Sequence, residues 1–147
     1  MDTEEWKLEE LKRRTKRAGV AIVETKGIKG TKTIKRLDET ADRLLLDVPC
    51  SGLGVLKRNP DAKWKLDKAF IDRIRETQKY ILDYYPRMLK KGGLMVYATC
   101  SILPSENTSQ VKAFLANHPE FELLKEEQLF PSEAGFDGFY MALLKKN

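Results

Sequence analysis

The sequence predicts an α/β fold with a mainly parallel sheet and an antiparallel pair of strands at its C-terminal edge. Short apolar segments typical of strands alternate with longer segments of helical periodicity. Residues 43–98 have the order strand, helix, strand, which makes the two strands parallel through a right-handed crossover. The last two apolar segments are close in the sequence, which favours antiparallel pairing. With 147 residues, 41% hydrophobic and 33% charged, the chain is expected to form one domain over residues 1–147.

The N-terminal part is expected to contain a helix over residues 4–18 and then a short buried strand over residues 20–23. Asp2 and Glu5 resemble a capping box at the start of this helix, and Gly19 suits its C-terminal end. Its apolar stripe consists of Leu8, Leu11, Thr15 and Ala18.

The central part is expected to supply the parallel pair of strands. Residues 43–48 (RLLLDV) form a continuous apolar run, typical of a parallel strand covered on both faces. The loop over residues 49–66 is too long to lack a function in a compact domain. A helix over residues 67–91 follows, with an aspartate at its N-cap, an interruption at Pro86 and two glycines after its end. Residues 94–98 (LMVYA) form the next strand.

The C-terminal part is expected to contain one more helix and the antiparallel strands. The helix begins near residue 105, and the strands cover residues 121–124 and 138–144. A βαβ unit followed by this pair completes the predicted α/β sheet.

The net charge of +5 is unevenly placed along the chain: residues 1–100 carry +8 and residues 101–147 carry −3. Such a split suggests a basic face turned toward a polyanion, although a solvated lysine-rich surface explains it equally well. No apolar run approaches the ~18 residues that span a bilayer, and the acidic N-terminus is unlike a secretory signal. We therefore expect a cytoplasmic protein without a membrane partner.

Two cysteines stand immediately after the two strands that the central part predicts. Cys50 follows residues 43–48 and Cys100 follows residues 94–98, so both lie at the carboxyl edge where open α/β sheets bind ligands. Neighbouring strands are ~4.8 Å apart, which allows both thiols to line one pocket. The alternative is that each cysteine is a small buried hydrophobe. No C-x-x-C or H-x-x-x-H spacing exists, which argues against a zinc site.

Four segments resemble motifs of RNA (cytosine-5) methyltransferases of the RsmB/Sun/NSUN type, and most closely the bacterial ribosomal-RNA branch. Residues 47–54 (DVPCSGLG) are similar to the motif D-A-P-C-S-G-x-G, with valine in place of alanine. Residues 97–107 (YATCSILPSEN) resemble the second cysteine motif, T-C-S followed by Glu-Asn. Residues 57–61 (KRNPD) resemble the basic stretch after the first motif, and residues 137–140 (DGFY) resemble the closing segment. The resemblance implies a Rossmann-like methyltransferase sheet.

The resemblance also implies a reaction. Carbon 5 of cytosine is a poor nucleophile until a thiolate adds at carbon 6, after which carbon 5 accepts the methyl group of S-adenosylmethionine. In this family Cys100 corresponds to the attacking thiol and Cys50 to the thiol that assists release of the adduct.

The remaining roles come from the same resemblance. Asp47 would bind the cofactor or the target base, Pro49 would shape the base pocket, and Lys57 and Arg58 would contact RNA, expected to be ribosomal. The cytosine has to be unstacked to be reached.

Two segments of the family pattern are missing from this sequence: the glycine-rich cofactor loop after the first strand and the carboxylate after the second. The chain therefore resembles the C-terminal portion of the catalytic domain, an incomplete Rossmann-like sheet that lacks the first cofactor-binding strands. We expect weak or no binding of S-adenosylmethionine, an isolated chain without activity, and self-association through exposed sheet edges. The alternative is a catalytically silent, truncated RNA-binding module. A thiol redox protein is disfavoured, because the cysteines are fifty residues apart.

Overall fold

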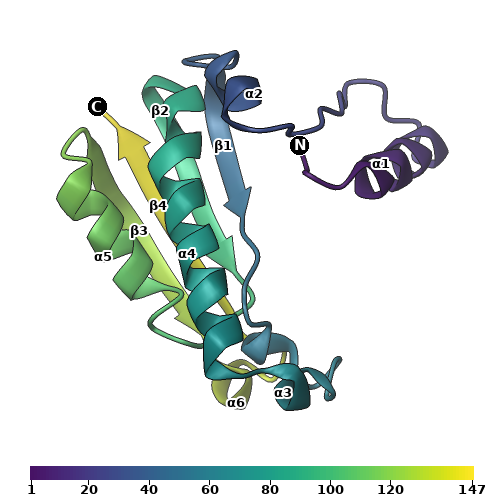
Figure 1. The fold of residues 1–147 in the computed structure, drawn as a ribbon, viewed down its shortest axis with the longest axis vertical. Coiled ribbons are helices and arrows are strands. Elements are labelled where there is room, and N and C mark those ends of the chain that lie inside the picture. Colours follow the sequence, from purple (N-terminus) through teal and green to yellow (C-terminus); the bar gives the residue numbers. More distant parts are fainter.

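Four strands form one open sheet in the order β1-β2-β4-β3 (Figure 1). They are β1 (Ala41–Asp47), β2 (Leu89–Thr99), β3 (Phe121–Leu129) and β4 (Phe139–Lys146). The computed structural model describes residues 1–147, leaving aside the side chains of Lys65 and Ala134. β1 and β2 are parallel, whereas β4 pairs antiparallel with both β2 and β3. The α/β class and the antiparallel C-terminal edge are confirmed. The sheet is also mainly parallel, because β1, β2 and β3 run in the same direction and only β4 is reversed. The described residues contain two crossovers between strands of the same direction: α4 connects β1 to its neighbour β2, and α5 connects β2 to β3, with β4 inserted between these two strands.

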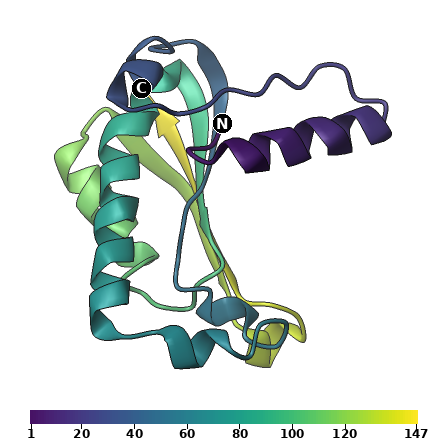
Figure 2. The same ribbon diagram turned by 45° about the vertical axis from the view of Figure 1, so that its right-hand side comes forward.

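Helices cover one face of this sheet. α4 (Lys68–Tyr84) and α5 (Thr108–Asn117) lie side by side on that face in both ribbon views (Figures 1 and 2). The Asp67 side chain caps α4 by accepting a hydrogen bond from the Phe70 N–H at 2.6 Å. The other helices are α1 (Glu5–Arg17), α2 (Thr31–Lys35), α3 (Ala62–Lys65) and α6 (Pro131–Ala134), with 3₁₀ turns η1 (Leu53–Val55) and η2 (Tyr85–Met88).

The core lies between the sheet and α4 and α5. It is centred on the neighbouring strands β2 and β4, where Tyr97 and Tyr140 are fully buried and their rings meet edge to face at 6.2 Å. The other apolar residues of this core include Leu82, Leu89, Met95, Val111, Phe114, Ala142 and Leu144. This packing fixes the carboxyl ends of β1 and β2 relative to α4.

The crossover differs from expectation at its C-terminal end. α4 ends at Tyr84 because Pro86 lacks an N–H for the helix, and β2 begins at Leu89 rather than residue 94. The two glycines do not end a helix; they lie in an irregularity of β2, where the pairing with β1 shifts and Gly92 has φ 77°. A glycine with positive φ suits a bulge as well as a helix end, so the sequence alone favoured the wrong element.

The N-terminal part departs most from the sequence prediction. The strand predicted over residues 20–23 is wrong: the segment has no strand partner, and Ile22 is 92% exposed. α1 is present and ends as predicted, but it projects away from the sheet (Figures 1 and 2), and Leu8 is its only buried residue. Glu4 is its N-cap and makes no side-chain cap, so the capping box is also wrong.

β1 was expected to be covered on both faces, and this too is wrong. Leu46 is buried on the helix side, but Leu45 on the other face is 67% exposed. Among the described residues β1 pairs only with β2, so it forms one edge of the sheet. A continuous apolar run therefore does not ensure burial on both faces.

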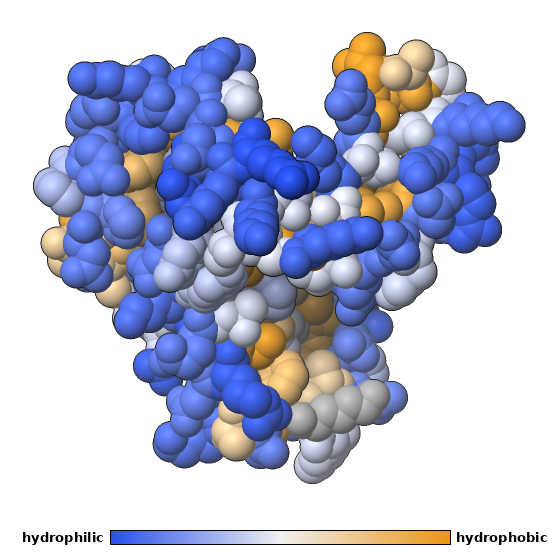
Figure 3. Space-filling model, turned by 45° about the horizontal axis from the view of Figure 1, so that its top comes forward, coloured by the Kyte–Doolittle hydropathy of each residue, from blue (hydrophilic) through white to orange (hydrophobic). Residues whose placement is uncertain are grey.

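The surface is largely polar. Hydrophilic side chains cover much of the face shown in Figure 3, while hydrophobic side chains are visible at the tip of the projecting lobe on its right and in the lower centre. Of the helices in the described part of the chain, none combines the length and the apolar content needed to cross a bilayer.

Candidate active site

The structure brings the two cysteines together. Cys50 follows β1 and Cys100 follows β2, and the parallel register pairs Asp47 with Ala98 just before them. Their Sγ atoms are 3.2 Å apart, within hydrogen-bond distance for sulfur, and both residues are half-buried at the carboxyl edge of the sheet. The two thiols thus face each other from adjacent loops, and both remain accessible from that edge.

The hydrogen bond between the two thiols shifts their pKa values in opposite directions. The hydrogen bond from Cys50 lowers the pKa of Cys100 to about 7, although partial burial and the charges of Asp47 and Glu106 act against ionisation. The same hydrogen bond raises the pKa of Cys50, and burial raises it further. Cys100 is therefore the thiol that ionises first, and Cys50 is the proton donor to it. The group that promotes ionisation of Cys100 is the other thiol rather than a cation.

Polar contacts hold the loop of Cys100. The Asn107 side chain accepts from the Thr99 hydroxyl at 2.7 Å and donates to the Ser101 carbonyl at 2.9 Å, so it contacts both neighbours of Cys100. Thr99, Ser101 and Asn107 are all buried. The asparagine of the second cysteine motif thus stabilises the conformation of this loop.

Three of the four motif segments meet at Gly54. Its N–H donates to the Cys100 carbonyl at 2.9 Å, and its own carbonyl accepts from Gly138 at 2.7 Å. A Cβ at position 54 would lie 2.2 Å from the Gly138 oxygen, so no larger residue fits there. The long loop is therefore anchored to Cys100 and to the closing segment.

The basic residues of this loop lie at its surface. Lys57 and Arg58 are exposed, and Arg58 forms an ion pair with Asp137 of the closing segment. Trp64 is 79% exposed and carries the Lys63 ammonium over its ring at 4.8 Å. The Trp64 ring therefore lies outside the core.

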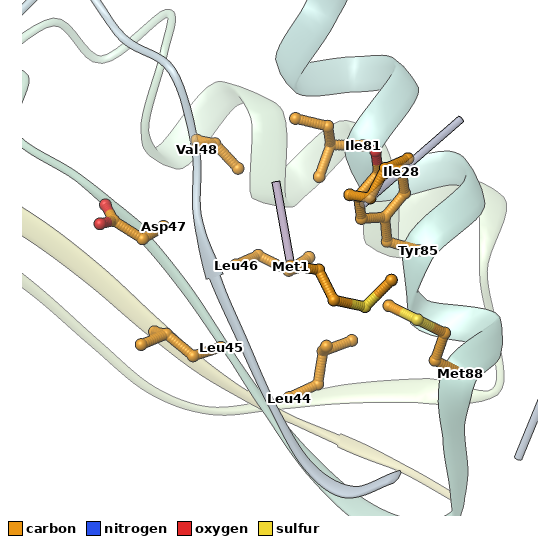
Figure 4. Close-up of a pocket in the computed structure, with 10 residues that line it drawn as sticks. All are labelled: Met1, Ile28, Leu44, Leu45, Leu46, Asp47, Val48, Ile81, Tyr85 and Met88. Atoms are coloured by element: carbon orange, nitrogen blue, oxygen red, sulfur yellow. The ribbon is translucent and has the colours of Figure 1, made fainter. Parts of the chain in front are cut away.

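Asp47 and Pro49 border a cavity beside the cysteine edge. Both are exposed, and no described residue donates a hydrogen bond to the Asp47 carboxylate. A cavity of about 680 Å³ is lined by Asp47, Val48 and Pro49, by Tyr80 and other residues of α4, and by N-terminal residues. A smaller cavity of about 250 Å³ adjoins it, and Figure 4 shows the Asp47 carboxylate pointing away from the apolar side chains that line this one.

Sequence reasoning missed one member of the site, Gln78. This residue is fully buried on α4 and its amide donates to the Pro49 carbonyl at 2.9 Å and to the Glu106 carboxylate at 3.0 Å. The signal was present: Gln78 interrupts the apolar stripe of its helix between Ile74 and Ile81. A polar residue on the buried stripe of a helix needs a partner, and here the partner is the cysteine site.

Comparison with known proteins gives one consistent family. The family described as 16S rRNA methyltransferase RsmB/F matches residues 1–145. Ribosomal RNA small subunit methyltransferase B of Vibrio cholerae is 47% identical over 114 residues, which are 74% of this chain and 26% of the relative. The protein of the same name from Pasteurella multocida is 41% identical over 126 residues, or 77% of this chain and 28% of the relative. The chain thus spans about a quarter of the length of these curated relatives.

Solved structures agree with this assignment. The crystal structure of PH0851 superposes with a TM-score of 0.93 at 33% identity, covering 99% of this chain and 36% of that one. The structure of NSun6 from Pyrococcus horikoshii with SFG gives a TM-score of 0.85 at 25% identity, covering 98% of this chain and 40% of that one. On these matches, the chain belongs to the 16S rRNA methyltransferase RsmB/F family, whose members are S-adenosylmethionine-dependent methyltransferases with a Rossmann-like fold.

Proposed function

We propose that residues 1–147 form the C-terminal part of a catalytic domain that methylates carbon 5 of a cytosine in ribosomal RNA, with Cys100 as the nucleophile. The observation that carries this proposal is the thiol pair, with its 3.2 Å separation and the lowered pKa of Cys100. A thiolate near neutral pH is the group that addition to a pyrimidine ring requires.

The proposed cycle uses one covalent bond to the protein. The Cys100 sulfur adds to carbon 6 of cytosine, and the electron pair of the carbon 5–carbon 6 bond becomes available at carbon 5. S-adenosylmethionine supplies, when bound, the methyl group that carbon 5 accepts. Water at this half-buried edge then takes the carbon 5 proton, the electron pair of that C–H bond re-forms the carbon 5–carbon 6 double bond, and the carbon 6–sulfur bond breaks to release the Cys100 thiolate.

Cys50 assists the last step of this cycle. It keeps its proton at neutral pH because its pKa is raised, and that proton lies on the hydrogen bond to Cys100. When Cys100 is expelled, this hydrogen bond stabilises the departing thiolate. This assigns Cys50 the release role that the family resemblance implies.

Asp47 and the adjoining cavity fit part of the cofactor. S-adenosylmethionine carries positive charge on its sulfur and its amino group, and the Asp47 carboxylate has no cationic partner among the described residues. The volume of about 680 Å³ beside it is in the range of small-molecule sites. The glycine-rich segment that the family uses is not among residues 1–147, so these contacts are expected to give weak binding or none.

RNA contacts are proposed for the exposed loop after Cys50. Lys57 carries a charge that no described acidic residue neutralises, while Arg58 is already paired with Asp137. Lys57 is therefore the better candidate for a phosphate contact, and Trp64 is available for stacking on a base. Pro49, exposed between Asp47 and Cys50, is placed to border the target base. Ribosomal RNA as substrate would place the protein in the cytoplasm.

Trapping with 5-azacytidine tests the reaction. Covalent attachment of RNA that contains this base, incubated with the chain and saturating S-adenosylmethionine, would show that residues 1–147 retain catalysis despite the missing cofactor loop, and Cys100→Ala should then abolish attachment. Cys50→Ala should retain it, because the proposed attack needs only Cys100. Attachment that survives Cys100→Ala would refute the assignment of the nucleophile.

A second candidate is a silent RNA-binding module that keeps the thiol pair. The observation that favours it is that the cofactor loop is missing from these residues. RNA binding by the unchanged chain, together with no trapping at saturating cofactor, would support this candidate over catalysis.

Self-association is proposed for the outer edge of β1. Antiparallel pairing of two β1 strands centred on Leu45 would bring the exposed leucines together. The same register sets Arg43 opposite Asp47 of the second copy, so opposite charges would face each other twice.

A further inference from the structure

Glu106 is a fully buried carboxylate that lies between the two cysteine loops. Its exposed fraction is 0%, and no lysine, arginine or histidine within the described part of the chain forms an ion pair with it. Three donors bind it instead. The Ser51 N–H and the Gln78 amide donate to Oε2 at 2.8 and 3.0 Å, and the Ser101 hydroxyl donates to Oε1 at 2.8 Å. A buried charge is costly without such bonds, so the three contacts account for its presence.

Two of these three donors directly follow a cysteine in the sequence. Ser51 follows Cys50 and Ser101 follows Cys100, so a single carboxylate connects the residues after the two thiols. Gln78 also donates to the carbonyl of Pro49, the residue before Cys50. The chain on both sides of Cys50 is thus tied to Glu106, directly at Ser51 and through Gln78 at Pro49.

The bonds run between loops rather than within one loop. The carboxylate reaches from the turn before α5 to the loop after β1 at one oxygen and to the loop after β2 at the other. The Ser51 and Ser101 hydroxyls add a direct contact between the loops at 3.1 Å. This arrangement restricts how far one cysteine loop can move relative to the other.

The negative charge of Glu106 argues against a role in activating the Cys100 thiol. It raises the pKa of Cys100 and so disfavours the thiolate that the proposed reaction needs. The net lowering of that pKa comes from Cys50, which has to stay within hydrogen-bond distance of Cys100. Because the charge of Glu106 opposes ionisation of Cys100, its role is better explained by the two loops that its hydrogen bonds hold together.

We propose that Glu106 is a positioning residue whose carboxylate keeps the loops after β1 and β2 in register, so that the Sγ atoms of Cys50 and Cys100 stay at hydrogen-bond distance. Only the reason why the two thiols have to stay close, catalysis by Cys100 with help from Cys50, rests on the proposed function. The placement itself is measurable without RNA, cofactor or methyl transfer.

Thiol–disulfide exchange measures this placement in the whole chain. The two protein thiols and one glutathione disulfide give one protein disulfide and two glutathione thiols, and the equilibrium constant is the effective concentration of one cysteine at the other. Glu106→Asp keeps the charge but shortens the side chain by one methylene group, so it cannot reach both loops. Glu106→Gln keeps the length and can accept from Ser51 and Gln78 while donating to the Ser101 oxygen. Glu76→Gln, at an exposed position on α4, is the matched control.

Glu106→Asp should lower the effective concentration about 10- to 100-fold, the range expected for losing a buried hydrogen bond to a charged group. Glu106→Gln should stay within about fivefold of the unchanged chain, since neutral hydrogen bonds at the same positions are only modestly weaker. Glu76→Gln should have no effect.

The pKa of Cys100 gives a second readout that a general loss of stability would not produce. Cys50, Asp47 and Glu106 are the titratable groups that act on Cys100. Glu106→Asp keeps a thiol at position 50 and carboxylates at positions 47 and 106. Titration of the thiolate absorbance should therefore show the pKa of Cys100 rising toward its ordinary value only if Cys50 has moved away.

An effective concentration and a Cys100 pKa in folded Glu106→Asp equal to those of Glu76→Gln would overturn the proposal. If Glu106→Asp fails to fold, Ser101→Ala decides, because it removes the Oε1 contact and should lower the effective concentration more than Ser51→Ala, which removes the Ser51–Ser101 hydroxyl contact but keeps every bond to Glu106. A value in Ser101→Ala no lower than that in Ser51→Ala would then overturn the proposal. Failure of 5-azacytidine trapping would count against the proposed function and leave these measurements unaffected.

Discussion

Replacing Cys50 with alanine should raise the pKa of Cys100, because the Cys50 thiol donates the hydrogen bond that stabilises the Cys100 thiolate. That pKa is held at about 7, against 9.0 for an ordinary cysteine. Without Cys50, partial burial is the largest remaining influence and, with the charges of Asp47 and Glu106, disfavours the thiolate, while a backbone hydrogen bond favours it. The pKa should therefore return to its ordinary value or exceed it.

The size of this effect follows from the titration. A return from about 7 to 9.0 lowers the thiolate fraction at pH 7 from about one half to about 1%, or about fiftyfold. The rate of alkylation will fall by less, because a thiolate of higher pKa is intrinsically more nucleophilic, by about eightfold over two pKa units. The midpoint of the pH profile is thus a better measure than the rate at one pH.

Alkylation of Cys100 by iodoacetamide, followed by mass spectrometry across a pH series, gives this midpoint. Cys50→Ser is the matched control, since its hydroxyl can still donate to Cys100 and should preserve part of the shift. A midpoint that stays near 7 in Cys50→Ala would refute the reasoning, because another group would then be responsible for the acidity of Cys100.

Three further outcomes are expected. Gly54→Ala should destabilise the fold in urea unfolding by about 1–3 kcal/mol, the range for forcing an atom into a packed site, because its Cβ would lie 2.2 Å from the Gly138 oxygen. Gly27→Ala should not destabilise the fold, because its Cβ would meet nothing closer than 3.8 Å. Equal losses of stability in the two variants would contradict the close contact between Gly54 and Gly138. Leu45→Lys should abolish concentration-dependent association in size-exclusion chromatography with light scattering, because a charge on an edge strand blocks pairing; unchanged association would rule out the β1 edge. Isothermal titration of the chain with S-adenosylmethionine should show weak binding or none, and sub-micromolar binding would overturn the expectation that the missing loop is required.

The sheet was predictable from the sequence where apolar runs are bounded by clear turn signals. β4 agrees closely with the segment at residues 138–144, and the break at Pro86 follows from its missing N–H. The Gly92-Gly93 pair predicted a helix end wrongly, because the positive φ of Gly92 is compatible with a helix end and with a bulge. Residues 20–23 were mistaken for a strand because their apolar character says nothing about whether a partner strand lies alongside.

The site was predictable in its residues but not in its geometry. Strand ends alone placed Cys50 and Cys100 at one edge of the sheet. The strand register stops at Asp47 and Ala98, and neither thiol lies on a strand. Their 3.2 Å separation depends on side chains from α4 and from the turn before α5, Gln78 and Glu106. No local pattern encodes a contact between residues 28 or 55 positions apart.

A pair of thiols suits the proposed chemistry better than a thiol beside a cation. Cys100 has to attack as a thiolate and leave again as a thiolate, so its partner should stabilise the anion without holding it permanently. A lysine or histidinium would stabilise the thiolate strongly in every state of the cycle, which would slow attack and favour departure. A neutral Cys50 donor gives a weaker bond, which is lost when Cys100 bonds to carbon 6 and forms again when Cys100 is expelled. The single histidine, His118, is stacked on Phe114 at the end of α5 and does not contact either thiol, which leaves this task to Cys50.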